Sequence, residues 1–352
     1  MTPIDRLDLM LNDMASADPL FRPTNFWDTG LVAIVDDLRA QGFDNFRAHK
    51  SALEMYVPTY ASSAYRNNPA SIHRLAKLIR GLARNDRVAD LLLDDHVGKL
   101  QAQRDYLVFQ AASRQASEPH LHDLSESEAG QPFEQHTFEE RRFSRSFLNY
   151  LRGMAFLKQH ADTSRLNSAL EIGGGFGTAG EILLKARPRA VYVNVDIPPV
   201  AAVSTYYLKQ ALGDETVLGY EATRELETID ISRLPDGVRA VILCPWQLPK
   251  LVGEFDLFIN FISFQEMEPD VVANYIKLVQ PLTKRFVLLR NSHSGKQVVT
   301  KAGELGVFNP SSVDAMIDSF SAFELLARDY RVFGEFNEKS GFRSEVVAMQ
   351  RK

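Results

Sequence analysis

Two patterns of apolar and polar positions divide the chain, and one gives way to the other near residue 165. Before that point, apolar residues recur every three or four positions, which is the period of an amphipathic helix. This spacing predicts helices over 29–39, 71–79 and 138–158, with a polar loop over 117–132 between the last two. The first part of the chain is therefore predicted to be mainly helical.

After residue 165, short apolar runs alternate with amphipathic ones. The short runs predict strands over 168–172, 190–195, 240–243, 255–262 and 285–289, and helices are predicted over 178–185, 201–212 and 269–279. Such an alternation indicates an α/β fold with a mostly parallel sheet and helices on both faces. Near the C-terminus, strand-like runs over 330–336 and 343–349 flank a turn, which predicts a hairpin and an antiparallel edge strand.

These patterns predict two domains, a mainly helical one over 1–160 and an α/β one over 161–352, and a chain of 352 residues is long enough for both. The composition is that of a globular protein, with 45% hydrophobic and 24% charged residues. A net charge of -5 argues against a nucleic-acid partner, because coating nucleic acid requires a concentrated basic surface.

The cysteine and hydropathy patterns exclude further classes. Cys244 is the single cysteine, so an internal disulfide and a cysteine-based zinc site are excluded. No run approaches 18 apolar residues, and acidic side chains near the N-terminus replace the basic ones of a signal peptide. We therefore expect no membrane partner and a cytoplasmic location.

The run from Glu171 to Gly180 carries the most specific chemistry. Residues 171–177 read as E-x-G-x-G-x-G, and residues 175–180 read as G-x-G-x-x-G. Either pattern, between a strand and a helix, lets a nucleotide ligand approach bare backbone. Asp196 ends the next strand 19 residues after Gly177, where a carboxylate accepts both ribose hydroxyls. The alternative for Asp196 is an isolated acidic residue in a turn.

NAD and S-adenosylmethionine share that ribose, and Glu171 distinguishes between them. In a dinucleotide site the helix N-terminus faces a pyrophosphate. Glu171 would then be an unpaired carboxylate at the end of a buried strand, which costs free energy. The amino-acid end of S-adenosylmethionine carries an ammonium, which gives such a carboxylate a partner. Glu171 therefore favours a methyl donor. The alternatives are an NAD-dependent oxidoreductase and a non-catalytic binding module of the same fold.

At these residues the sequence resembles the class I methyltransferases, over roughly 165–352. The resemblance includes the glycine run, Asp196, the fourth strand and the closing hairpin, which looks like the reversed last strand of that fold. The glycine run is also similar to that of a bacterial family of sugar O-methyltransferases, as are residues 21–28, 206–208 and 244–247. The resemblance implies a Rossmann-like class I methyltransferase sheet, S-adenosyl-L-methionine as the cofactor, and a small-molecule or glycan acceptor.

The resemblance also implies roles for individual residues. The methionine part of the cofactor is expected at Glu171, Gly173, Gly175 and Gly177, the ribose at Asp196, the adenine at Trp246 or Gln247, and the sulfur at Asn260 and Phe261. A core aromatic is the alternative for Trp246. The helical domain is expected to supply the acceptor pocket and is the candidate contact of a homodimer.

Transfer of a methyl group to a hydroxyl is an in-line displacement that calls for a positioned base. Glu266 follows the fourth strand, where many members of the family carry a histidine; here Gln265-Glu266 stands in place of Glu-His. A carboxylate acts as a base when burial raises its pKa. His293 follows the fifth strand and titrates near neutral pH. Both are predicted as catalytic residues, with an ordinary loop residue as the alternative for each.

Two further groups are weaker candidates. Arg47 and His49 are hypothesised to close over the acceptor from the N-terminal half. Glu266, Glu268 and Asp270 alternate along the chain and offer the oxygen ligands that magnesium prefers. Glu268 and Asp270 nevertheless mark a helix start, where acidic residues offset the helix dipole. We therefore expect no metal site.

Overall fold

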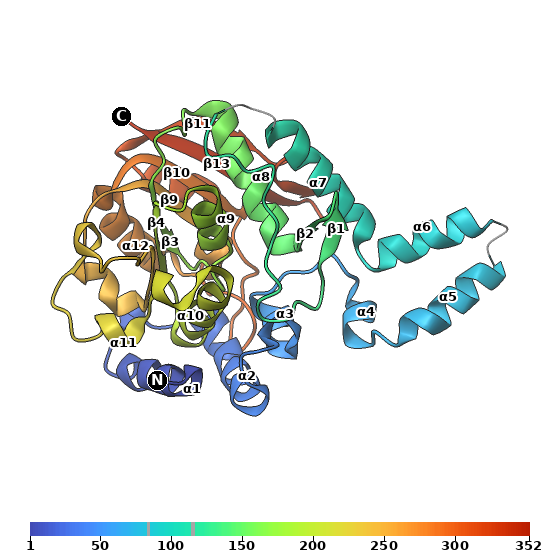
Figure 1. Cartoon of the computed structure of the whole chain (residues 1–352), viewed down its shortest axis with the longest axis horizontal. Helices are drawn as coiled ribbons and strands as arrows, with labels where there is room; N and C mark the ends of the chain where they lie inside the picture. Colours follow the sequence, from blue (N-terminus) through green and yellow to red (C-terminus); the bar gives the residue numbers. More distant parts are fainter. Residues whose placement is uncertain (83–84, 114–116) are drawn as a thin grey trace.

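A computed structural model describes residues 1–82, 85–113 and 117–352. Its centre is a nine-stranded sheet in the order β11-β13-β10-β9-β3-β4-β7-β5, with β12 paired to β13 beside that path (Figure 1). The strands are β3 (Ser168–Ile172), β4 (Val191–Val195), β5 (Val217–Leu218), β7 (Ala240–Leu243), β9 (Phe255–Phe261), β10 (Thr283–Ser292), β11 (Phe323–Asp329), β12 (Glu335–Asn337) and β13 (Phe342–Arg351). The predicted α/β class with a mostly parallel sheet is confirmed.

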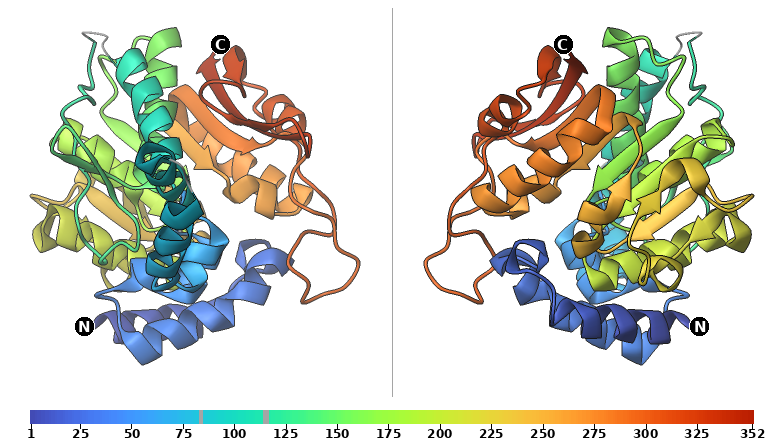
Figure 2. Two further views of the ribbon diagram at one scale, coloured as in Figure 1. Left: turned by 90° about the vertical axis from the view of Figure 1, so that its right-hand side faces the viewer. Right: turned by 90° about the vertical axis from the view of Figure 1, so that its left-hand side faces the viewer.

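Helices cover both faces of the sheet (Figure 2). Side chains along the central strands alternate between two hydrophobic cores, one on each face. In β3, Ala169 belongs to the core that contains side chains of α8, α9 and α10, whereas Leu170 and Ile172 belong to the core with α12 and α13. Because both faces are covered, β3 is buried along its whole length, as is typical of parallel sheets. These helices are α8 (Arg145–His160), α9 (Thr178–Ala186), α10 (Pro198–Leu212), α12 (Pro269–Leu282) and α13 (Val313–Ser319).

The C-terminal strands confirm the antiparallel last strand and correct its position. β12 and β13 form the predicted hairpin, and β13 runs antiparallel to β10, with Leu289 opposite Val347. However, β13 is not an edge strand, because β11 pairs with its other side. The sequence did not predict β11, since most of its residues are exposed or half-buried and give no clear apolar pattern.

A second correction concerns the predicted helix over 138–158. A short antiparallel hairpin of β1 (His136–Phe138) and β2 (Arg141–Phe143) precedes the helix. Glu139 and Glu140 turn the chain with φ angles of 48° and 65°. Ser144 then caps α8, since its Oγ accepts a hydrogen bond of 3.2 Å from the Phe147 N–H. The helix therefore begins at Arg145.

The first part of the chain is mainly helical, as predicted. Its helices are α1 (Pro3–Met14), α2 (Asn25–Gln41), α3 (Lys50–Met55), α4 (Ser63–Asn67), α5 (Ser71–Leu82), α6 (Asp86–His96) and α7 (Lys99–Ser113). α5 and α6 form an arm that projects from the body (Figure 1). The smaller elements of the second part are α11 (Tyr220–Thr223) and the parallel pair β6 (Ile229–Asp230) and β8 (Leu251–Val252).

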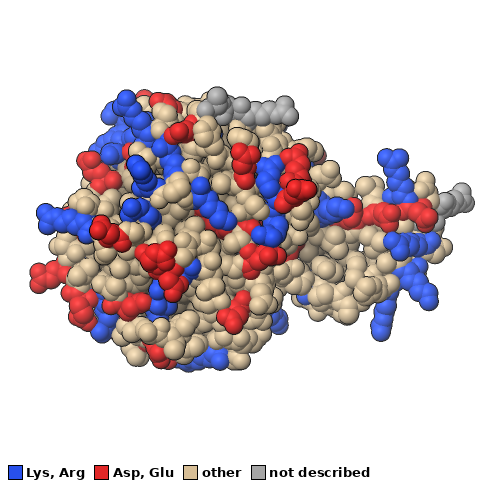
Figure 3. Space-filling view, viewed as in Figure 1, with Lys and Arg blue, Asp and Glu red and all other residues tan. Residues whose placement is uncertain are grey.

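One hydrophobic core contains side chains from both predicted domains, among them Leu7, Phe46, Phe176 and Leu288. Helices α1, α2, α3 and α7 are therefore packed onto the α/β part. Over the body, the face in Figure 3 carries acidic and basic side chains interspersed with one another. Among the described residues, no helix combines the length and the apolar character that crossing a membrane requires.

Candidate active site

A cavity of about 270 Å³ lies at the carboxyl ends of β3, β4 and β9. Open α/β sheets bind ligands at this edge, where the strand order reverses. The sheet side of its wall consists of residues 173–176, Asp196, Ile197, residues 261–263, Glu266 and Met267. The other side comes from the helical part of the chain, with Trp27, residues 53–58, Ser146, Asn149 and Tyr150. The two predicted domains thus meet at the cavity.

The predicted glycine loop forms the floor of the cavity. At Gly173, φ is 67°, and a Cβ atom would lie 2.2 Å from the Ser263 Oγ, so no side chain fits. At Gly175, φ is 59° and a Cβ atom would meet nothing within 4 Å, so a side chain there would occupy ligand space. Gly177 is the N-cap of α9 and lies outside the cavity wall.

Asp196 lies beside this loop and lines the cavity, as the sequence predicted. Its Oδ2 accepts a hydrogen bond of 2.9 Å from the Gly175 N–H, and its Oδ1 accepts one of 2.8 Å from the Ile197 N–H. Burial raises the pKa of the carboxyl group to about 8, although the two backbone hydrogen bonds oppose the shift. Asp196 therefore couples the glycine loop to the end of β4.

Glu171 does not line the cavity, and the structure gives it protein partners. Tyr150 donates a hydrogen bond of 2.7 Å to its Oε1, and Tyr192 donates one of 2.5 Å to its Oε2. The carboxylate lies behind Gly174, whose Cβ would be 2.6 Å from Oε2. Burial raises the pKa of Glu171 to about 7, and the two tyrosine hydrogen bonds oppose this rise. The expectation that only a cationic ligand would satisfy Glu171 is therefore wrong.

The end of β9 supplies a second part of the floor. The Phe261 ring lines the cavity and stacks on Tyr150, with ring centroids 4.6 Å apart and planes at 5°. Ile262 follows with a φ of 75°, which is strained for a β-branched residue and typical of functional sites. Asn260 lies outside the wall, where its Nδ2 donates to the Ser263 Oγ at 2.6 Å and to the Ile172 carbonyl at 3.0 Å. Asn260 therefore stabilises the turn after β9, whose residues 261–263 line the cavity.

Trp246 and Gln247 also lie outside the cavity wall. The Trp246 indole N–H donates to the Tyr220 hydroxyl at 3.1 Å. The Gln247 amide accepts a hydrogen bond from the Cys244 N–H and donates one to Thr223. Both side chains thus stabilise the segment after β7, and neither lines this cavity.

Of the two predicted bases, Glu266 lines the cavity. It is buried, and its Oε1 lies 2.8 Å from the Lys296 Nζ. Burial raises the pKa of Glu266, while the Lys296 ammonium opposes the shift. Thr24, just before α2, donates a hydrogen bond of 3.0 Å to the Glu266 carbonyl. The start of α2 therefore fixes the turn that carries Glu266.

His293 lies away from the cavity wall. Its Nδ1 is 2.8 Å from the Glu345 Oε1, and Arg328 and Arg343 pair with the same carboxylate. Glu345 belongs to β13, on the far side of β10 from the cavity. The structure thus places His293 in an ion-pair cluster around the buried Glu345 carboxylate, outside the cavity wall.

The three alternating carboxylates do not converge. Glu266 pairs with Lys296, Glu268 accepts hydrogen bonds from the backbone N–H groups of Phe308 and Asn309, and Asp270 lies in the first turn of α12. Over the described ranges, no three side chains of the histidine, cysteine, aspartate or glutamate type gather at a metal-binding distance.

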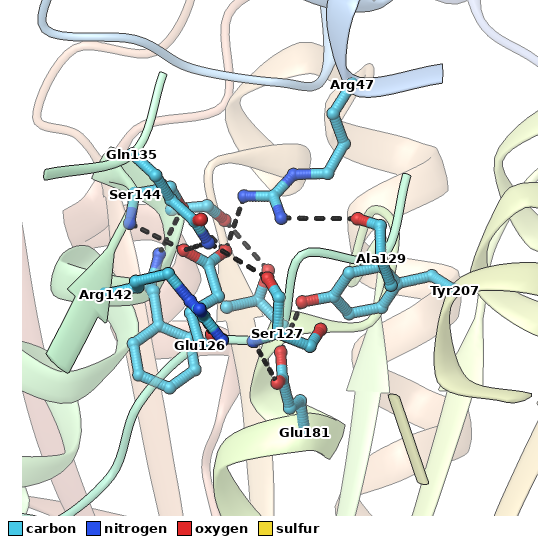
Figure 4. A network of polar contacts seen from close by, with 12 residues as sticks. Arg47, Glu126, Ser127, Ala129, Gln135, Arg142, Ser144, Glu181 and Tyr207 are labelled. Atoms are coloured by element: carbon cyan, nitrogen blue, oxygen red, sulfur yellow. Dashed lines mark hydrogen bonds and ion pairs between the residues drawn. The ribbon is translucent and has the colours of Figure 1, made fainter. Parts of the chain in front are cut away.

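Arg47 does not close over an acceptor, because it belongs to a buried polar network (Figure 4). Its Nη2 lies 2.5 Å from the Glu126 Oε1, and its guanidinium lies 5.0 Å from the centre of the Phe176 ring. Figure 4 shows Glu181 and Tyr207 in the same network, joined by a hydrogen bond. The network therefore supports the glycine loop from behind. His49 bonds Asn45 at 2.9 Å and also lies outside the wall.

Sequence reasoning missed the residues that the helical part contributes to the cavity. Trp27, Asn149 and Tyr150 lie on α2 and α8, where their spacing reads as that of ordinary helix positions. Tyr56 also lines the wall, and its buried hydroxyl has no hydrogen-bond partner among the described residues. Burial raises its pKa, and nearby Asp196 adds to the rise. No local motif marks these positions, because only the packing of the helices over the sheet edge brings them together.

The charge of the wall is its most informative property. Three carboxylates line it, those of Glu54, Asp196 and Glu266. Within the described part of the chain, its wall contains no lysine, arginine or histidine. The Glu54 side chain is exposed and Glu266 pairs with Lys296, so Asp196 is the buried carboxylate of this wall without a cationic partner in the described chain. A buried negative charge is costly without a partner, so the wall favours a cationic ligand beside Asp196.

Neither the known protein-family models nor the curated proteins include a match to this chain. Among solved structures it is similar to the magnesium protoporphyrin IX methyltransferase from Synechocystis PCC 6803 with bound SAM, at 10% identity and a TM-score of 0.37, over 58% of this chain and 79% of that one. It is also similar to the mitomycin 7-O-methyltransferase MmcR, at 14% identity and a TM-score of 0.35, over 95% of this chain and 74% of that one. At TM-scores this low, these likenesses decide nothing about function, which is argued from the cavity.

Proposed function

We propose that this chain is an S-adenosylmethionine-dependent methyltransferase that methylates a sugar hydroxyl. The observation that carries the proposal is the acidic wall at the switch point, where Asp196 is buried without a cationic partner in the described chain and Glu54 and Glu266 line the same cavity. S-adenosylmethionine carries a sulfonium and an ammonium, and when bound it supplies an activated methyl group. Its positive charges suit this wall.

The cavity residues also fit the rest of that cofactor. Asp196 is the side chain that would accept the ribose hydroxyls, since its carboxylate ends β4 beside the loop. Gly173 and Gly175 would let the methionine part approach the backbone. The strand order supports the same class. Outward from β3 the sheet runs β9, β10, β13 and β11, and β13 is antiparallel to β10, like the reversed last strand of the class I methyltransferases that the sequence resembles.

An NAD-dependent oxidoreductase fits less well. A pyrophosphate would bring two negative charges to a wall that already holds three carboxylates. The helix N-terminus that would face it is also occupied, since Thr178 and Ser146 share a hydrogen bond of 3.0 Å and Phe176 is buried. The electrostatics and the packing therefore both disfavour a dinucleotide.

Glu266 is our candidate for the base that takes the proton of the acceptor hydroxyl. It is the buried carboxylate at the β9 end of the cavity, next to Phe261, and Lys296 favours its ionised form. Trp27 and Tyr56, from the helical part, would shape the space for the acceptor. The sugar itself rests on the resemblance of the glycine run and of three other segments, and a glycoside, a nucleotide sugar or a glycan would each present such a hydroxyl.

Calorimetric titration with S-adenosylmethionine, S-adenosylhomocysteine and NAD tests the proposal. We expect both adenosyl ligands to bind and NAD not to bind. Binding of NAD alone would overturn the proposal in favour of an oxidoreductase. Methyl transfer from labelled S-adenosylmethionine to a panel of sugars, glycosides and nucleotide sugars then tests catalysis, and binding without turnover on any acceptor would favour a non-catalytic module.

A further inference from the structure

Arg290 is a buried arginine without a carboxylate partner in the described chain. It lies on β10 with 3% of its surface exposed, and its Nη1 donates a hydrogen bond of 2.7 Å to the Asn149 Oδ1. Its buried Nε has no hydrogen-bond partner in the part of the chain that the structure describes. An arginine stays charged in proteins, and a buried charge without a counter-charge costs several kcal/mol. Arg290 therefore carries a buried charge that no carboxylate of the described chain neutralises by direct contact.

The neighbouring charges increase this cost. Arg145 pairs with Glu335 at 3.2 Å, and Arg152 pairs with Asp105 at 2.7 Å, so both carboxylates near Arg290 already have a partner. Burial, followed by the charges of Arg152 and Arg145, lowers the pKa of Arg290 to about 10. The cluster of three arginines and two carboxylates therefore has an excess of one positive charge.

Asn149 connects this charge to the cavity. It lines the cavity wall and lies one turn of α8 after Arg145. Because a guanidinium can only donate hydrogen bonds, the Asn149 oxygen must face Arg290. The amide Nδ2 is then the remaining donor of Asn149, and no hydrogen bond of the described chain uses it. Asn149 thus presents a donor at the wall with a buried cation behind it.

The strand order gives this pair a definite place. Along the carboxyl edge the strands run β4, β3, β9 and β10, so Asp196 and Arg290 lie three strand spacings apart, about 14 Å. Phe261 of β9 lies between them and is the register neighbour of Arg290. The wall is therefore acidic at the β4 end and has a cation behind it at the β10 end.

We propose that Asn149 and Arg290 form an anion-binding subsite at the β10 end of the cavity, for a carboxylate or phosphate group. This inference rests on the proposed function, because the adenosyl ligand fills the acidic end and directs the anion to the opposite end. The anion is either the α-carboxylate of the methyl donor or an acidic group on the acceptor, such as the carboxylate of a uronic acid or the phosphate of a sugar phosphate.

The test is calorimetry on the full chain with Arg290→Met, which removes the charge and keeps an unbranched side chain. Because Arg290 has no carboxylate partner in the described chain, Arg290→Met strands no buried counter-charge, and urea denaturation of the variant checks that it folds. Arg290→Lys keeps the charge, and Arg285→Met is the matched control, since Arg285 lies on the same strand and bonds the Asp162 carbonyl at the surface. The ligands are S-adenosylhomocysteine and methylthioadenosine, which lacks the amino-acid part. Phosphate and acetate are then added to the S-adenosylhomocysteine complex and to the ligand-free chain.

We expect Arg290→Met to weaken one anionic ligand at least tenfold, with methylthioadenosine unchanged and both controls close to the native chain. Loss confined to S-adenosylhomocysteine identifies the donor carboxylate, and loss confined to phosphate or acetate identifies an acidic acceptor. Equal binding of every ligand by the variant and the native chain would overturn the subsite, as would an equal loss of methylthioadenosine. If the native chain binds neither adenosyl ligand, the proposed function fails, and the phosphate and acetate titrations still test the subsite.

Discussion

The Tyr150 hydroxyl donates a hydrogen bond of 2.7 Å to Glu171, while the Tyr150 ring stacks on Phe261 in the cavity wall. One side chain thus satisfies the carboxylate behind the glycine loop and forms part of the site. Tyr150→Phe keeps the stack and removes the hydrogen bond, so we expect the free energy of unfolding to fall by about 1–3 kcal/mol. Urea denaturation measures this change. Tyr56→Phe is the control, because the Tyr56 hydroxyl has no hydrogen-bond partner among the described residues. An equal fall in the free energy of unfolding in both variants would contradict a stabilising role of the Tyr150 hydrogen bond.

Two buried carboxyl groups at the glycine loop, those of Glu171 and Asp196, predict that stability falls as the pH rises. In the folded chain the pKa of Glu171 is about 7 and that of Asp196 about 8, both raised mainly by burial. The unfolded values are about 4. The folded state therefore holds protons that the unfolded state releases, and the free energy of unfolding of the ligand-free chain falls as the pH rises from about 4 to about 8. Denaturation at a series of pH values measures the slope, and Asp196→Asn should flatten it.

We expect Asp196 to contribute strongly to the affinity for the adenosyl ligand. Loss of its charge in Asp196→Asn should weaken S-adenosylhomocysteine by roughly 10- to 100-fold, as expected for hydrogen bonds to a charged group. In the native chain the affinity should rise with pH up to about 8, because binding favours the ionised carboxylate. Trp246→Phe is the matched control and should leave the affinity unchanged, since Trp246 bonds Tyr220 outside the wall. A loss in Trp246→Phe instead would restore the predicted adenine contact.

The two candidate bases give opposite expectations. With any acceptor that the chain methylates, Glu266→Gln should lower kcat by about 10²- to 10⁴-fold, with S-adenosylhomocysteine affinity nearly unchanged. His293→Gln should leave kcat close to the native value, because His293 pairs with Glu345 away from the cavity. Steady-state kinetics on both variants decides between them, and the reverse result would return the base to His293.

The buried pair of Arg47 and Glu126 supports the glycine loop through the Phe176 ring. Arg47→Met leaves the Glu126 carboxylate buried without its counter-charge, so we expect a loss of about 3–5 kcal/mol in the free energy of unfolding. Adding Glu126→Gln should recover part of that loss, because the stranded charge is then removed. A double-mutant cycle by urea denaturation measures the coupling, and purely additive losses would show that the pair does not act as a unit.

Local patterns in the sequence determined the sheet and the loop that carries the site. Period-two and continuous apolar runs predicted most of the parallel strands, and the glycine spacing placed Gly173 and Gly175 at the turn after β3. Asp196 and Glu266 were also predicted, because the carboxyl ends of parallel strands share one edge. These features are local in the chain or follow from strand direction, and so they can be read without contacts.

Only the tertiary structure decided which side chains reach the cavity. The sequence predicted Glu171 as a ligand contact, but the structure shows it buried and hydrogen-bonded to Tyr150 of α8 and Tyr192 of β4. His293 lies outside the cavity wall for a similar reason, since β13 brings Glu345 next to it and the two side chains pair. Partners that lie far apart in sequence leave no local signal, and the burial and charge of a site depend on them.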